Sequence, residues 1–376
     1  MAKKNTKDVL SAVADKFAVL PPDTLPDGTV VAPRWSSGIK PLDTLLGGGF
    51  PKGRIVAFGS EEGVGKTTIL LHAALNIIEN YGKKVVYMDI EGGVSYSMLE
   101  GIGLLPHLRS KDNPDGLFYL LSLETIQDIN STFQLMQKDG NVALAIIDSD
   151  TNVIDATVLE AEAMGATKNT VAEGARMWSA NFKKINAIVK RTDMCLVVIH
   201  QARTDLSGFH VVMRPSGGKA AKHVASVEIW GVRRDYIGEG DVLTDTTGKK
   251  IRKGDAIGAR IQLTTLKNRL GLPFRAVNAY LYFGKGISTK WSYRELLEEM
   301  TILNEETGEL TPVLKTGSWP VLTLPGKVYK GADYRGNEGT WKLMEDHWEE
   351  IEEYVESQGG FLTTANNDLA DLMEES

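Results

Sequence analysis

A glycine-rich segment at residues 59–68 (GSEEGVGKTT) constrains the fold of this 376-residue chain more than any other feature of its sequence. It follows an apolar run at residues 54–58, typical of a buried strand, and it opens a helical pattern at residues 66–80. A strand, a glycine-rich turn and a helix in this order form a phosphate-binding loop, because glycines let backbone N–H groups wrap phosphates and the helix N-terminus favours negative charge. We expect a nucleotide to bind to the loop residues Ser60, Glu61, Glu62, Gly63, Val64, Gly65, Lys66, Thr67 and Thr68.

The loop departs from the usual pattern, G-x-x-x-x-G-K-[ST], at its first position. Ser60 stands where the pattern has glycine, and a glycine comes one residue earlier, at Gly59. Since Gly59 and Gly63 give the backbone freedom on both sides of Ser60, we expect the loop to form nonetheless. Lys66 would then reach the β- and γ-phosphates of ATP, and the Thr67 hydroxyl would be a ligand of Mg²⁺.

Polar residues follow three later apolar runs, at the points where strands are expected to end. They are Glu91, Asp148 and Gln201. In an open α/β sheet, ligands bind at the carboxyl ends of the strands, so these side chains should converge with Lys66 on one site. Asp148 suits the binding of Mg²⁺, directly or through water, and Glu91 suits the orientation and deprotonation of an attacking water. Gln201 would sense the γ-phosphate, and the set predicts a catalytic site for ATP hydrolysis.

Strand-like and helical patterns alternate between about residues 31 and 285, which predicts an α/β fold with a mostly parallel central sheet. Expected strands lie at residues 54–58, 84–90, 142–147, 194–199, 226–233, 260–266 and 276–283, the last ones antiparallel, and expected helices lie at 66–80 and 173–190. We divide the chain into an N-terminal oligomerisation helix and linker (1–32), an ATPase core (33–285), a small C-terminal α/β domain (286–356) and a flexible acidic tail (357–376). The helix expected at residues 5–20 has one apolar stripe, so it needs its own core or a neighbouring subunit to pack on.

The net charge of −7 hides an asymmetry along the chain. Residues 341–376 contain eleven acidic residues and one basic residue, which leaves the preceding 340 residues with a net charge of +3. An acidic total therefore does not exclude a nucleic-acid partner for the main body. The apolar runs are shorter than the ~18 residues that a membrane span needs. The single cysteine, Cys195, excludes a disulfide framework, and we expect it to pack inside a strand.

Several further motifs, in this order, resemble those of the RecA-type DNA strand-exchange recombinases. They are residues 36–43 (SSGIKPLD), 47–56 (GGGFPKGRIV), 88–91 (MDIE), 174–177 (GARM), 201–203 (QAR), 217–227 (GGKAAKHVASV), 267–269 (KNR) and 273–274 (PF). The resemblance covers about residues 33–290 and is more specific than the phosphate-binding loop alone. Residues 304–309 (NEETGE) and the chain length are similar to those of phage-encoded, UvsX-like members.

The resemblance implies a RecA-like P-loop ATPase that forms a head-to-tail helical filament on single-stranded DNA and catalyses homology search and strand exchange with duplex DNA. ATP and Mg²⁺ would bind between subunits, with Lys267 and Arg269 placing positive charge on the γ-phosphate of the neighbouring subunit. It also implies single-strand-binding and loader proteins as partners, and a location in the cytoplasm of a bacterial or phage-infected cell. The adenine-stacking tyrosine of the family falls on Met98, with Tyr96 nearby but out of register, so the base contact is left open.

Two segments are expected to bind DNA by the same resemblance. Arg176 ends the first, and the second is a basic, glycine-rich mobile loop from about residue 202 to 222. The expected DNA-binding residues are Arg176, Arg203, Leu206, Phe209, Arg214, Gly217, Gly218, Lys219 and Lys222. Basic side chains would neutralise phosphates, while Leu206 or Phe209 would wedge between bases. Because Gln201 begins this loop beside the γ-phosphate, it would couple ATP state to DNA binding.

Three alternatives stay open. A clock-protein-like or paralogue ATPase of the same superfamily would regulate without exchanging strands, and the five basic residues of the second loop argue against it. A hexameric helicase motor shares the core chemistry but usually has a separate N-terminal domain. A nucleotide-dependent filament scaffold would hydrolyse little ATP despite Glu91.

Overall fold

The computed structural model describes residues 33–149, 153, 170–205, 212–215, 223–239, 249–303 and 308–357, together with two short paired strands, β1 (Asp23–Thr24) and β2 (Val30–Val31). At residues 23–24, 30–31, 170–177, 201–205 and 212–215, and at residue 356, only the backbone is described. The helix expected at residues 5–20 and the tail expected at 357–376 therefore lie almost wholly outside the described part, which reaches Ser357.

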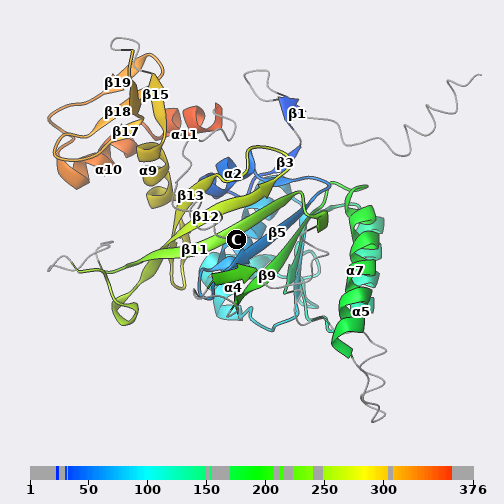
Figure 1. Ribbon diagram of the computed structural model, residues 1–376. Coiled ribbons are helices and arrows are strands. Elements are labelled where there is room, and N and C mark those ends of the chain that lie inside the picture. The colour runs from blue at the N-terminus through cyan, green and yellow to red at the C-terminus, as the bar shows by residue number, and fades with distance from the viewer. Residues whose placement is uncertain are drawn as a thin grey trace, which may run out of the picture.

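A ten-stranded sheet forms the centre of the molecule (Figure 1). Its strands are β5 (Ile55–Ser60), β6 (Lys84–Asp89), β7 (Phe118–Leu121), β8 (Val142–Asp148), β9 (Cys195–Asp205), β10 (Val212–Pro215), β11 (Val227–Ile237), β12 (Gly258–Asn268), β13 (Ala276–Tyr282) and β14 (Gly286–Ser288). The order is β14-β13-β12-β11-β5-β9-β8-β6-β7, and β10 pairs with β9. Neighbours from β11 to β7 are parallel, while β11 to β14 are antiparallel. The predicted α/β fold, its mostly parallel sheet and its antiparallel later strands are confirmed.

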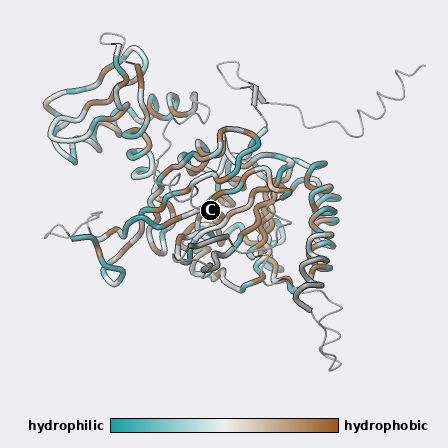
Figure 2. The backbone as a smooth tube through the Cα atoms, in the orientation of Figure 1, coloured by the Kyte–Doolittle hydropathy of each residue, from teal (hydrophilic) through white to brown (hydrophobic). Residues whose placement is uncertain are grey.

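Helices cover both faces of this sheet. One face packs against α2 (Lys40–Leu46) and α3 (Lys66–Tyr81), and the other packs against α5 (Ile126–Asp139) and α7 (Thr170–Val189). The strands between them are apolar almost throughout, as Figure 2 shows in brown, because strands buried on both faces need apolar side chains at every position. Cys195 is buried in β9, as expected.

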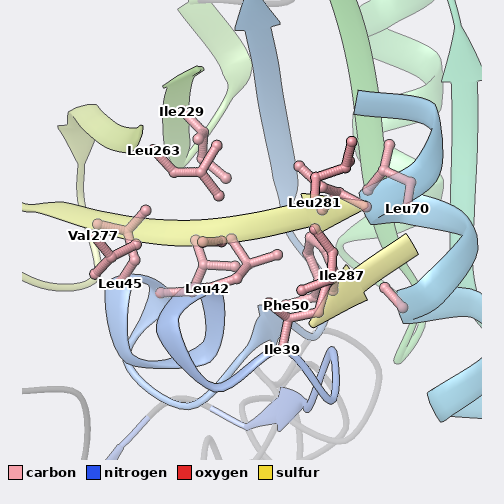
Figure 3. Close-up of a cluster of buried hydrophobic side chains, with 14 of the residues drawn as sticks. Ile39, Leu42, Leu45, Phe50, Leu70, Ile229, Leu263, Val277, Leu281 and Ile287 are labelled. Atoms are coloured by element: carbon pink, nitrogen blue, oxygen red, sulfur yellow. The ribbon is translucent and has the colours of Figure 1, made fainter. Parts of the chain in front are cut away.

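The alternation of side chains along β6 assigns them to the two layers. Val85 and Tyr87 belong to the core on the α3 side, and Val86 and Met88 belong to the core on the α5 and α7 side. On the α3 side the core continues into α2, whose Leu42 lies with Leu281 of β13 in the same cluster (Figure 3). This continuous core holds the P-loop helix and the antiparallel strands in one unit.

Helix α3 is also attached to β14. The backbone N–H of Ile287 donates to His72 Nε2 at 3.1 Å. Gly286 has a φ of +95°, and a Cβ atom there would lie 1.8 Å from His72 Nε2. Glycine is therefore required for this close approach.

The C-terminal region combines helices with short antiparallel strands. Its elements are α9 (Thr289–Glu299), β15 (Thr301–Leu303), β16 (Leu310–Pro312), β17 (Leu314–Lys315), β18 (Val321–Leu324), β19 (Lys327–Tyr329), α10 (Gly336–Asp346) and α11 (Trp348–Ser357). An aromatic chain joins it to the sheet: Trp291 of α9 stacks on Tyr280 of β13 at 5.5 Å between ring centroids and meets Trp341 of α10 edge-on at 4.7 Å. Within the described residues no helix is long and apolar enough to cross a membrane.

Candidate nucleotide site

The phosphate-binding loop connects the last residue of β5, Ser60, to the first residue of α3, Lys66. Gly63 and Gly65 have φ values of +71° and +88°, a region that side chains rarely adopt. A Cβ atom on Gly65 would also lie 2.3 Å from Leu281 Cδ1. Glycine is therefore needed in this loop both for the positive φ values and, at Gly65, for the close packing against Leu281.

Ser60 fits the loop without being glycine. It is the final residue of a strand, fully buried, and it is not among the residues with positive φ. Its hydroxyl accepts a hydrogen bond from Lys66 Nζ at 2.8 Å and donates to the carbonyl oxygen of Glu61 at 2.6 Å. The departure from the usual pattern therefore adds a polar contact that holds the loop lysine.

The ammonium group of Lys66 is partly removed from water. Burial lowers its pKa, while the nearby carboxylates of Asp148, Glu91 and Glu62 act in the opposite direction. The site therefore holds a partly desolvated cation close to several anionic groups, where a charged interaction is stronger than in bulk water.

Asp148 lies at the end of β8 and accepts two hydrogen bonds at the same carboxylate oxygen. Thr67 Oγ1 donates to Asp148 Oδ2 at 3.2 Å, and the Tyr87 hydroxyl donates to the same atom. Burial raises the pKa of Asp148, and the hydrogen bonds from Tyr87 and Thr67 oppose this rise. A carboxylate and a hydroxyl at a phosphate loop are oxygen ligands of the kind that Mg²⁺ takes beside a nucleotide, so these residues fit the expected metal.

Glu91 lies directly after β6 and is held against the end of β8. The Ser149 hydroxyl donates to Glu91 Oε1, and the backbone N–H groups of Ile90 and Glu91 donate to the Asp148 carbonyl oxygen at 2.7 and 3.2 Å. The predicted convergence of Lys66, Glu91 and Asp148 is what the structure has: Glu91 and Asp148 are close enough to act on the pKa of Lys66.

Gln201 pairs with Ser60 across the parallel ladder of β9 and β5, so its backbone lies beside the loop. The segment after it differs from the mobile loop expected from the sequence. Strand β9 continues to Asp205 and pairs antiparallel with β10, with Arg203 directly opposite Arg214. Arg176 lies within α7. The remaining expected DNA-binding residues, Leu206, Phe209, Gly217, Gly218, Lys219 and Lys222, lie outside the described residues.

Lys267 and Arg269 lie at the end of the strands opposite the phosphate-binding loop. Strand β12 is antiparallel to β11, and Lys267 pairs with Glu228 of β11. Glu228 pairs in turn with Ala57 of β5, and Ala57 comes three residues before Ser60. At about 3.3 Å per residue this is roughly 10 Å along the strands, and two strand spacings separate β12 from β5. Partial burial and the charge of Arg269 lower the pKa of Lys267. The backbone of both residues therefore lies at the end of the strands opposite the phosphate-binding loop.

Three polar residues of the site were missed in the sequence. Tyr87 and Asp89 precede Glu91 by four and two residues, and Asp89 accepts hydrogen bonds from the N–H groups of Gly93 and Val94, both at 3.0 Å. Ser149 is the third. A signal was present for the first two, because residues two apart on a strand share a face, but Tyr87 read as part of an apolar run. Both candidates for the contact with the adenine base remain. Tyr96 is 70% exposed, and Met98 packs against the core.

Comparison with known proteins identifies the family. A model described as the RecA N-terminal domain matches residues 27–288. The chain belongs to this family. The protein RecA of Chlamydia trachomatis is 31% identical over 289 residues, 75% of this chain and 71% of its own. The protein RecA of Phytoplasma mali is 26% identical over 328 residues, 86% and 84% of the two chains. A crystal structure of the RadB recombinase aligns with 67% of this chain and 98% of its own, at 21% identity and a TM-score of 0.46. The resemblance to RecA-type recombinases is confirmed, and it supports a function in recombination.

Proposed function

We propose that this protein is an ATP-dependent recombinase that assembles head-to-tail on single-stranded DNA and exchanges strands with a homologous duplex. The observation that carries the proposal is the placement of the expected site residues at two opposite ends of the strands of one sheet. Lys66, Glu91 and Asp148 lie at the end that carries the phosphate-binding loop, and Lys267 and Arg269 lie at the other end. A contact that joins the first end of one subunit to the second end of the next is head-to-tail. Such contacts form closed rings where the rotation between subunits closes and helical filaments where it does not, and the proposal is a filament.

The residues of one chain would divide the chemistry of hydrolysis between them. Lys66 would bind the phosphates, and Thr67 with Asp148 would hold Mg²⁺, which neutralises charge on the phosphate oxygens when bound. Glu91, held by Ser149, would accept the proton of the attacking water. Lys267 and Arg269 of the adjacent subunit would stabilise the charge that develops on the transferred phosphoryl group.

The β9–β10 hairpin would connect this chemistry to DNA. It extends β9 beyond Gln201, whose backbone pairs with Ser60 of the phosphate loop. The backbone register places two basic residues, Arg203 and Arg214, opposite one another in this hairpin. Basic residues neutralise nucleic-acid phosphates, so we expect the hairpin to bind DNA.

Finer features of the proposal rest on the sequence. These are the UvsX-like subtype, the loader and single-strand-binding partners, the cytoplasm of a bacterial or phage-infected cell, and the domain limits at residues 32, 285 and 356. They stay predictions.

The test is a titration of ATPase activity against single-stranded DNA, read beside electron microscopy of the same samples. We expect hydrolysis to require DNA and helical filaments to form with ATP. Hydrolysis that is independent of DNA, in closed rings, would replace the recombinase with a helicase-like motor. Filaments with negligible hydrolysis would favour a scaffold.

A further inference from the structure

The hydroxyl of Tyr87 reaches Asp148 from the interior of the protein. Tyr87 is fully buried in β6, the strand next to β8, and its ring lies 6.4 Å from that of Phe118. Tyr87 pairs with Ile146 and Asp89 pairs with Asp148, so alternation puts Tyr87 and Asp148 on the same face of the sheet. That is the face covered by α3, in whose first turn Thr67 lies. The contact is therefore a diagonal cross-strand pair that a long side chain can span.

Two aspartates lie on this face, and their surroundings differ. Asp89 has both carboxylate oxygens engaged by the N–H groups of Gly93 and Val94, so it holds the turn after Glu91. Asp148 accepts from Thr67 and Tyr87 at one oxygen, Oδ2. Thr67 is itself an expected metal ligand, whereas Tyr87 is held by the core and keeps its place whichever partner Thr67 takes.

We propose that Tyr87 is a positioning residue for Mg²⁺: its hydroxyl fixes the orientation of the Asp148 carboxylate so that Asp148 can serve the metal that accompanies ATP. The proposal rests on the proposed function, because it assumes that Asp148 and Thr67 bind Mg²⁺ with the nucleotide. Hydrogen bonds to a ligating carboxylate orient it, and removal of such a partner typically lowers metal affinity about 10–100-fold. A phenylalanine at this position would fill the same space in the core without this contact.

The test compares Tyr87→Phe with wild type in the absence of DNA. We would measure binding of a fluorescent, non-hydrolysable ATP analogue as a function of free Mg²⁺. The expected result is an increase of about 10–100-fold in the Mg²⁺ concentration required, with nearly unchanged nucleotide affinity at saturating Mg²⁺. Binding of Mn²⁺ with the same analogue, followed by electron paramagnetic resonance, gives a readout that is independent of turnover. The matched control is Tyr354→Phe, which removes the hydroxyl of a buried tyrosine in α11 and should leave the Mg²⁺ requirement unchanged.

A double-mutant cycle with Asp148→Asn separates positioning from packing. If Tyr87 acts through the carboxylate, its hydroxyl should have little further effect on Mg²⁺ dependence once Asp148 is replaced. Equal Mg²⁺ requirements in wild type and folded Tyr87→Phe would overturn the role of Tyr87 and leave the proposed function intact. A wild-type protein that binds the analogue equally well with and without Mg²⁺ would overturn the assumed Mg²⁺ site at Thr67 and Asp148, and the role of Tyr87 with it.

Discussion

Glu299 makes a pH dependence of stability accessible to experiment. It lies one turn after Glu295 on α9, and Asn278 Nδ2 donates to both carboxylates, at 3.0 and 3.1 Å. Burial and the charge of Glu295 raise the pKa of Glu299 to about 7, from an ordinary value of 4.5. Arg260, which contacts Glu295, and Glu298 also act on it, in opposite directions. The negative charge on Glu299 is therefore unfavourable in the folded protein.

The sign and size of the effect follow from this difference. A raised folded pKa contributes stability that is fully present below pH about 4.5 and is lost as the pH rises through about 7. At about 1.36 kcal/mol per pKa unit the full difference corresponds to roughly 3 kcal/mol. Since Glu299 is only partly buried, solvent screening reduces this to about 1–2 kcal/mol.

The substitution Glu299→Gln should remove this loss. We expect the free energy of unfolding, measured by urea denaturation, to rise by about 1–2 kcal/mol at pH 8 and to change little at pH 5. The control is Glu100→Gln, an exposed residue of α4 (Tyr96–Ile102), which should change the free energy of unfolding little at either pH. If Glu299→Gln raised the free energy of unfolding equally at both pH values, or did not raise it at pH 8, the proposed effect of Glu299 ionisation on stability would be refuted.

Further predictions concern the nucleotide site and its neighbours. Glu91→Gln should bind ATP and DNA but hydrolyse ATP at least about 100-fold more slowly in a steady-state assay, and wild-type turnover would remove its role as general base. Lys267→Ala should lose most DNA-stimulated hydrolysis, and mixing it with Lys66→Ala should restore part of the activity only if sites are shared between chains. Phe274, with a φ of +59° and 53% exposure, should tolerate glycine with unfolding free energy unchanged or raised by up to about 1 kcal/mol, while filament length by electron microscopy decreases if its ring contacts a neighbour. Deletion of residues 357–376 should strengthen duplex-DNA binding in a gel-shift titration, and unchanged affinity would leave the tail as a solubilising segment.

The parts of the fold that could be predicted are those with a strong local signal. The parallel strands carry continuous apolar runs, and the loop at residues 59–68 has both a motif and a strand–helix context. Helix α5 was missed although Thr125 and Asp128 form a capping box and Ile129, Phe133 and Met136 repeat at helical spacing. Strand β7, with four residues, has too short a pattern to distinguish from a loop.

Of the candidate site, the sequence predicts only the residues at the end of a strand or directly after it. Glu91 and Asp148 follow apolar runs, so their convergence with Lys66 follows from the topology of a parallel sheet. The contact of Tyr87 with Asp148 depends on the register between β6 and β8, which no local pattern specifies. The end of the sheet at which Lys267 lies depends on the register between β12 and β11, which a single strand-like run does not reveal.

The separation of Lys267 and Arg269 from the loop has a consequence for any assembly built in the proposed way. A stack of subunits that share sites between neighbours leaves one P-loop uncovered at one terminus and one Lys267–Arg269 pair unused at the other. The two termini are then chemically unequal, because only one of them holds a nucleotide without cations from a neighbour. Hydrolysis would be slow there, whereas the adjacent, complete sites would turn over. Growth and shortening of the filament would consequently have a preferred direction that is set by the orientation of β12 in each chain.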